Sequence, residues 1–107
     1  MISTRQASKK QENKVAKLLG GRVQPNSGAT DFRKGDVVTK DMLIECKTSM
    51  TEKKSVAIQK EWLEKNQKEA FAMNKRKSAV CFDFGDDTRY YVIDEKTFKE
   101  MVEELDL

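Results

Sequence analysis

The sequence predicts one α/β domain that spans residues 1–107, with its elements in the order αββαββα. A length of 107 residues suits a single domain. Apolar residues recur at helical spacing in three segments and at strand spacing in the segments between them. Because no internal repeat, low-complexity tract or long linker divides the chain, we expect these elements to share one core.

The first predicted helix covers residues 4–19 and ends at Gly20-Gly21, where glycine readily adopts the left-handed conformation of a helix C-terminus. Glu12 lies inside the apolar stripe of this helix. A buried carboxylate is costly without a partner, so a surface role explains its position poorly. The residues that share this side of the helical wheel are Ser8, Glu12, Val15 and Leu19.

Two strands are predicted next, over residues 36–39 and 42–47, because both segments are rich in β-branched and apolar residues. They flank Lys40-Asp41, which suggests a hairpin with a two-residue turn. The preceding segment, residues 22–35, is rich in turn-forming residues and is the least regular part of the sequence.

The register of this hairpin places two carboxylates opposite each other. With a two-residue turn, Asp36 stands directly across from Glu45. Side chains alternate along a strand, so Glu45 and Lys47 point the same way. Ile44 and Cys46 point to the opposite face, which supplies core.

The remaining elements are a helix over residues 55–73, with Ser55 as its N-cap, and strands over residues 79–84 and 89–93. Asn74 follows the end of that helix, and an amphipathic helix closes the chain. The apolar residues that these two helices offer for burial are Ile58, Trp62, Leu63, Ala70 and Phe71 in the first and Phe98, Met101, Val102 and Leu105 in the second.

Composition excludes several kinds of chemistry. The chain has no histidine and two cysteines, Cys46 and Cys81, so it lacks the ligands of a four-ligand zinc site and the groups of Ser-His-Asp or Cys-His catalysis. An enzyme of this composition depends on carboxylates, lysine and a hard metal ion. No run approaches the roughly 18 apolar residues that cross a bilayer, and residues 1–10 lack the apolar region of a signal peptide. We therefore expect a cytoplasmic protein with no membrane partner and no organic cofactor.

The net charge of +3 conceals an uneven distribution. Residues 1–78 contain 18 Lys and Arg against nine Asp and Glu, whereas residues 79–107 contain three against nine. The basic portion is suited to a polyanion, because Lys and Arg neutralise nucleic-acid phosphates. A solvated surface with scattered charge is the alternative.

Asp36 and Glu45 repel each other across the predicted ladder unless a cation lies between them. Mg²⁺ is suited to this position, because it takes oxygen ligands from one or two carboxylates together with water and substrate phosphate. Lys47 lies two residues beyond Glu45 on the same face. Its ammonium group is placed to hold the attacking water and to offset charge in the transition state of phosphodiester hydrolysis.

The Glu-x-Lys pattern alone carries little information, because it occurs three times, starting at Glu12, Glu45 and Glu52. Only the copy at Glu45 follows an apolar strand and an Asp at the start of the preceding strand. An exposed cross-strand charge pair is the alternative for these residues.

The pattern resembles the PD-(D/E)XK nuclease superfamily and, within it, the archaeal-type Holliday junction resolvases. The resemblance covers roughly residues 5–93 and implies a restriction-endonuclease-like core, in which helices flank a mixed β-sheet. Gly35 stands where the name of the motif has proline. The matching pieces are Glu12, Ser27-Gly28, Gly35-Asp36-Val37, Leu43-Ile44-Glu45-Cys46-Lys47, and Gln59 ahead of the strand at 79–84.

The resemblance also implies a homodimer that cleaves branched DNA, such as a four-way junction, with Mg²⁺ or with Mn²⁺ in its place. By this analogy Asp36 and Glu45 bind the metal ion together with the backbone carbonyl of Cys46. Lys47 assists the attacking water, and Glu12 completes the acidic cluster. Ser27 is expected near the scissile phosphate.

Basic residues that flank this predicted site in sequence are candidates for phosphate contacts in DNA binding. A solvated surface position is the alternative for each of them. They are Lys9, Lys10, Arg22, Arg33, Lys34, Lys53 and Lys54.

Two other functions stay open at this point. One is a nicking or restriction-like endonuclease that acts on linear duplex or flap DNA, although so short a chain has no room for a separate sequence-reading domain. The other is a noncatalytic DNA-binding module that uses the basic surface alone. In that case Asp36 and Glu45 are dispensable.

Overall fold

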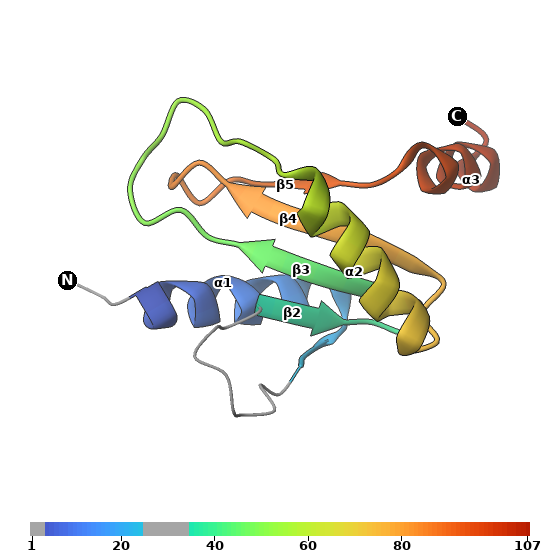
Figure 1. The fold of residues 1–107 in the computed structure, drawn as a ribbon, viewed down its shortest axis with the longest axis horizontal. Helices are drawn as coiled ribbons and strands as arrows, with labels where there is room; N and C mark the ends of the chain where they lie inside the picture. The colour runs from blue at the N-terminus through green and yellow to red at the C-terminus, as the bar shows by residue number, and fades with distance from the viewer. Residues whose placement is uncertain (1–3, 25–34) are drawn as a thin grey trace.

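The computed structural model describes residues 4–24 and 35–107, which form a mixed α/β fold (Figure 1). Its elements follow one another as α1, β1, β2, β3, α2, β4, β5 and α3. The helices are α1 (Thr4–Leu19), α2 (Lys60–Ala72) and α3 (Glu95–Leu105), and the strands are β1 (Arg22–Val23), β2 (Gly35–Val38), β3 (Met42–Lys47), β4 (Lys77–Asp83) and β5 (Arg89–Val92).

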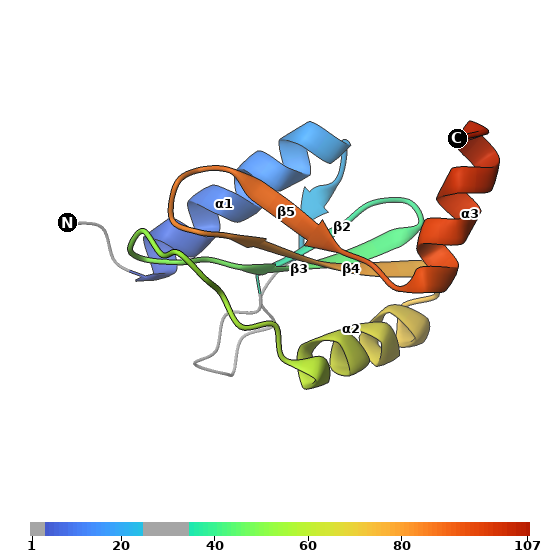
Figure 2. The ribbon, with the colours of Figure 1, turned by 90° about the horizontal axis from the view of Figure 1, so that it is seen from above.

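The strands form one five-stranded sheet in the order β1-β2-β3-β4-β5. Neighbouring strands are antiparallel except β3 and β4, which run parallel. A parallel pair needs a crossover connection, and α2 provides it. Figure 2 shows α1 against one face of the sheet and α2 against the other, so the sheet is mixed and flanked by helices.

The main apolar core lies between the sheet and α1, and a smaller cluster lies under α2. The smaller cluster joins Val38 and Leu43 of the hairpin to Ala70 of α2. Because consecutive residues of β2 and β3 contribute to different clusters, the alternation predicted for these strands is confirmed. The buried residues of the main core are Val15, Ala16, Val37, Ile44, Cys46, Ala79 and Cys81.

The β2–β3 hairpin has the predicted two-residue turn. The Thr39 N–H donates to the Met42 carbonyl at 3.0 Å, and the Thr39 hydroxyl accepts from the Met42 N–H at 3.1 Å. Asp36 pairs directly with Glu45, which confirms the expected register.

The ends of α1 and α2 also follow their sequence signals. Gly20, after α1, has a φ of 69°, and the Gly21 N–H donates to the Ala16 carbonyl at 2.9 Å. Asn74 has a φ of 59° and ends the turn that follows α2. Both residues belong to the types that adopt the left-handed conformation at low cost.

Two expectations about the connecting segments are wrong. Arg22 and Val23 are not part of an irregular stretch, because they pair with β2 as β1, so the observed order is αβββαββα. Ser55 is not a helix N-cap, since α2 begins at Lys60 after Gln59. Local propensity predicts neither the pairing of β1 nor the start of α2 at Lys60, because both depend on contacts with chain segments that are distant in sequence.

The segment before α2 is held against the turn between β4 and β5. The Lys53 N–H donates to the Phe84 carbonyl at 2.8 Å. Gly85 approaches the backbone of Thr51 so closely that a Cβ atom would lie 2.3 Å from the Thr51 carbonyl oxygen. The residues around Thr51 and Lys53 therefore pack against the β4–β5 turn, and α2 begins only after them.

The apolar side of α3 is not buried, in contrast to the expectation. Phe98 and Leu105 are 60% and 63% exposed, and Phe71 of α2 is more exposed still. In both ribbon views α3 lies beyond the end of β5, away from the layers of α1 and α2 (Figures 1 and 2). Neither α3 nor another helix within the described ranges has the length and apolar character that crossing a bilayer demands.

Asn66 connects α2 to the two parallel strands and provides the first prediction. It is fully buried, and its amide donates to the carbonyls of Ala79 at 2.9 Å and Leu43 at 3.4 Å. We expect Asn66→Ala to lower the free energy of unfolding by about 1–3 kcal/mol, because buried acceptors lose their donor. Urea denaturation followed by circular dichroism measures this change. Gln67→Ala, at the exposed neighbouring position, is the control, and an equal loss in both variants would contradict the role of Asn66.

Candidate active site

Two carboxylates face each other across the β2–β3 ladder. Asp36 and Glu45 are direct partners and are only 8% and 5% exposed. Their neighbours Val37 and Ile44 point into the core under α1, so both carboxylates project from the face that α2 covers. Burying like charges opposite each other lowers stability unless a cation lies beside them.

Lys47 adds a positive charge beside this pair. Its Nζ lies 2.7 Å from Glu45 Oε2 and 4.6 Å from the centre of the Trp62 ring. The ammonium group is therefore held between a carboxylate of its own strand and an aromatic ring from the first turn of α2. About one third of the Lys47 side chain stays exposed (35%), so the group still reaches solvent.

An aromatic cluster borders Lys47 on the neighbouring strands. Phe82 pairs with Lys47 across the parallel β3–β4 ladder. Its ring centre lies 5.5 Å from that of Phe84 and 5.8 Å from that of Tyr90. The register places this ring cluster on the strands next to the one that carries Lys47.

Glu12 is buried on α1, at 8% exposure, in agreement with its place in the apolar stripe. Its negative charge acts on the thiol of Cys46. The pKa of this thiol is raised by its hydrogen bond with the Cys81 thiol, then by burial, and further by the charges of Glu12 and Asp36. Cys46 therefore stays protonated, which leaves its backbone carbonyl as the group that suits a hard metal ion.

Among the residues that the structure describes, acidic side chains do not form a three-ligand cluster. Across residues 4–24 and 35–107, no group of three or more His, Cys, Asp or Glu side chains is arranged to hold a metal ion. Glu12 is thus not placed with Asp36 and Glu45 as the third member of such a group. The donor set of two buried carboxylates still fits Mg²⁺, which takes one or two carboxylates and fills its other positions with water and phosphate.

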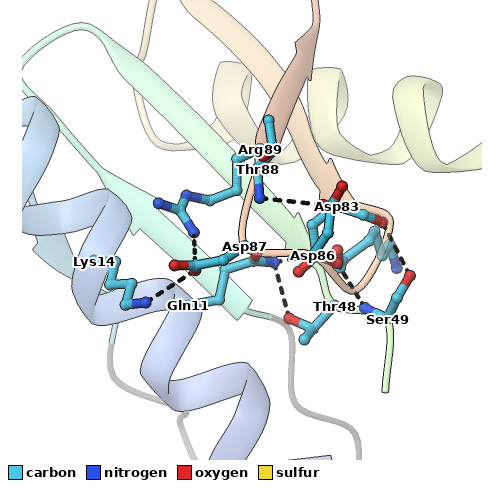
Figure 3. Close-up of polar contacts among 10 residues, drawn as sticks. Gln11, Lys14, Thr48, Ser49, Asp83, Asp86, Asp87, Thr88 and Arg89 are labelled. Atoms are coloured by element: carbon cyan, nitrogen blue, oxygen red, sulfur yellow. Dashed lines mark hydrogen bonds and ion pairs between the residues drawn. The ribbon is translucent and has the colours of Figure 1, made fainter. Parts of the chain in front are cut away.

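Two buried polar residues that the sequence pattern did not single out hold the segment after Lys47 (Figure 3). The Gln11 amide donates to the Lys47 carbonyl at 3.2 Å and to the Thr48 hydroxyl at 2.9 Å. The Asp83 carboxylate accepts from the Ser49 N–H at 2.8 Å. In the sequence, Gln11 is a polar residue beside the apolar stripe of a helix, and Asp83 is a polar residue at the end of an apolar strand. Neither position indicates which group the side chain will contact.

The predicted phosphate contacts that fall in the described part of the chain are all exposed. They come from α1, β1 and the loop before α2, and they are Lys9, Lys10, Arg22, Lys53 and Lys54. Ser27, Arg33 and Lys34 lie outside the described residues. Gln59 is the residue before α2 and is also exposed.

Comparisons of this chain with protein-family models, with curated proteins and with solved structures find no match. Asp36, Glu45 and Lys47 are therefore the residues whose geometry and chemistry indicate what this chain does.

The contact between Lys47 and Trp62 gives a prediction for a double-mutant cycle. We expect Lys47→Met and Trp62→Leu to show a coupling in the free energy of unfolding of about 0.5–1 kcal/mol, because the ring attracts the ammonium group. Urea denaturation of the wild type, both single variants and the double variant measures it. Lys68→Met, at an exposed position of α2, replaces Lys47→Met in the control cycle. A coupling no larger than in that control would show that the ring does not hold Lys47.

Proposed function

We propose that the chain is a metal-dependent endonuclease that hydrolyses phosphodiester bonds in branched DNA, in the manner of a Holliday junction resolvase. The observation that carries the proposal is the buried, directly opposed pair Asp36 and Glu45, with the Lys47 ammonium 2.7 Å from Glu45. Paired carboxylates beside a lysine suit metal-assisted attack of water on a phosphate. The proposal includes a cytoplasmic location for this activity.

The arrangement of the elements supports a restriction-endonuclease-like core as part of this proposal. The acidic pair lies on adjacent antiparallel strands, Glu12 lies on the helix before them, and the crossover helix α2 follows Lys47. This order agrees with the one that the resemblance to PD-(D/E)XK nucleases implies. The short β1 strand is an addition at the sheet edge.

The position of each residue suggests its role. Asp36 and Glu45 hold Mg²⁺ or Mn²⁺, and the Cys46 carbonyl is a further oxygen donor. The metal ion, when bound, polarises the scissile phosphate and stabilises the negative charge that develops on it. Trp62 and Glu45 fix the position of the Lys47 ammonium group. From there Lys47 orients the attacking water and offsets the negative charge that develops on the phosphate. Glu12 contributes a further negative charge from α1.

Cleavage of a labelled synthetic four-way junction tests the proposal. With Mg²⁺ we expect paired nicks in opposing strands, and with EDTA we expect none. Asp36→Asn and Glu45→Gln should each lower the cleavage rate on the order of 100- to 1000-fold, because each removes a ligand of the metal ion that would stabilise charge in the transition state. Junction binding, measured in EDTA, should persist in both variants.

Glu52→Gln is the matched control for Glu45→Gln, because Glu52 begins another Glu-x-Lys pattern but is exposed. It should cleave at the wild-type rate. Full activity in Asp36→Asn or Glu45→Gln would reject the site. Equal cleavage of junction and matched linear duplex would favour a nicking or restriction-like enzyme, and metal-independent binding without cleavage would favour a noncatalytic module.

Paired nicks require two active sites, so the proposal includes a homodimer. The exposed stripe of Phe98, Met101 and Leu105 on α3 is suited to a second copy of the chain. It lies at the end of the molecule opposite the tip of β3 (Figure 1), so a partner docked there leaves the candidate active site open to DNA.

We expect the wild-type protein to be a dimer in light scattering at micromolar concentration and Phe98→Glu/Leu105→Glu to be a monomer, because charged groups at the centre of an apolar interface are strongly unfavourable. Lys96→Glu adds negative charge to the polar side of the same helix and should stay dimeric. Dissociation by both variants, or by neither, would contradict this interface.

A further inference from the structure

A polar groove lies on the α1 side of the sheet, at the end where β3 and β4 finish. It has a volume of about 340 Å³ and runs between α1 and the turn from β4 to β5. Three cationic residues line it: Lys10 and Lys14 of α1, and Arg89 of β5. Thr48, the residue after Lys47, lines it as well, so the groove adjoins the strand that carries the proposed catalytic lysine.

A carboxylate of the protein itself lies between two of these cations (Figure 3). Asp87 Oδ1 is 2.9 Å from Lys14 Nζ and 3.1 Å from a guanidinium nitrogen of Arg89. The pKa of Asp87 is held below its ordinary value, by Lys14 first and then by Arg89. The two cations therefore favour an anion at this point.

Asp87 is held only weakly in this position. Its side chain is 69% exposed, and exposed ion pairs are weak because water screens them. It also lies in a turn with a left-handed φ of 67°. An incoming anion can therefore displace this carboxylate without disturbing the core.

A phosphodiester group has the chemistry to replace the Asp87 carboxylate. It carries the same charge, and a guanidinium group such as that of Arg89 can bind phosphate through two parallel hydrogen bonds. Lys14 supplies a second charge-assisted donor. The Thr48 hydroxyl, which accepts from the Gln11 amide at 2.9 Å, also lines the groove.

We propose that this groove binds a backbone phosphate of the DNA, with Lys14 and Arg89 as its ligands and Asp87 as the internal anion that the phosphate replaces. The inference rests on the proposed function for the identity of the anion as DNA. It assigns DNA binding to two cations that are not among the residues flanking the acidic site in sequence. It also makes Asp87 a built-in competitor that weakens DNA binding.

Binding of a fluorescent four-way junction, measured by anisotropy in EDTA, tests the role of Asp87. We expect Asp87→Asn to bind roughly threefold more tightly than Asp86→Asn at low salt, because it releases two cations for phosphate. Asn tolerates the left-handed conformation at this position. Asp86→Asn is the control, because it removes the same charge from the same turn. Among the described residues, Asp86 accepts a hydrogen bond only from the Thr88 N–H.

The salt dependence of binding tests Lys14. Between about 50 and 200 mM salt, we expect the wild type to lose about threefold more affinity than Lys14→Gln, because one phosphate contact contributes about 0.9 to the slope of log affinity against log salt. Lys17→Gln, one turn away at an exposed position outside the groove, should keep the wild-type slope.

The outcomes separate this proposal from the nuclease proposal. Equal affinities of Asp87→Asn and Asp86→Asn, or equal slopes for Lys14→Gln and Lys17→Gln, would overturn the groove while Mg²⁺-dependent cleavage by the wild type stands. The expected differences without any cleavage would support the groove and reject the nuclease. A wild-type protein that binds no junction would overturn both.

Discussion

The register of β2 against β3 is the constraint on which the candidate site depends. A two-residue turn sets this register and brings Asp36 opposite Glu45. A slip of one residue would turn over the side chains of one of the two strands. Asp36 would then enter the apolar core under α1 as Val37 leaves it, or Glu45 would enter as Ile44 leaves it. The burial of these two apolar side chains therefore maintains the geometry of the charged pair on the opposite face.

Opposed buried carboxylates oppose folding, and the surrounding structure offsets part of that cost. Lys47 bonds to Glu45 and is itself held by the Trp62 ring, so its charge is available to the acidic pair and to solvent at once. Asn66 fixes α2, which carries Trp62, to both central strands. The groups that position Lys47 are thus tied to the parallel pair in the middle of the sheet.

The proposed contacts with DNA and with a second copy lie at opposite ends of the molecule. The acidic pair and Lys47 are reached from the α2 face, while the groove with Lys14 and Arg89 opens beside α1 near the tips of β3 and β4. The helix α3 lies at the far end of β5 (Figure 1). With this separation, a dimer formed through α3 would bury neither of the two proposed DNA-contacting surfaces.

Local sequence determined the bounds of α1, the two-residue hairpin turn and the alignment of Asp36 with Glu45, because helix periodicity, strand alternation and turn length act between neighbouring residues. It also indicated that Glu12 is buried. Only the tertiary structure decided the pairing of β1, the late start of α2, and the contacts of Lys47 with Trp62 and of Asp87 with its two cations. The partners in these contacts are distant in sequence, so their energies depend on where whole elements pack. An amphipathic helix has the same sequence pattern whether its apolar face packs on its own sheet or on another surface. Only the tertiary structure showed that the apolar face of α3 is exposed.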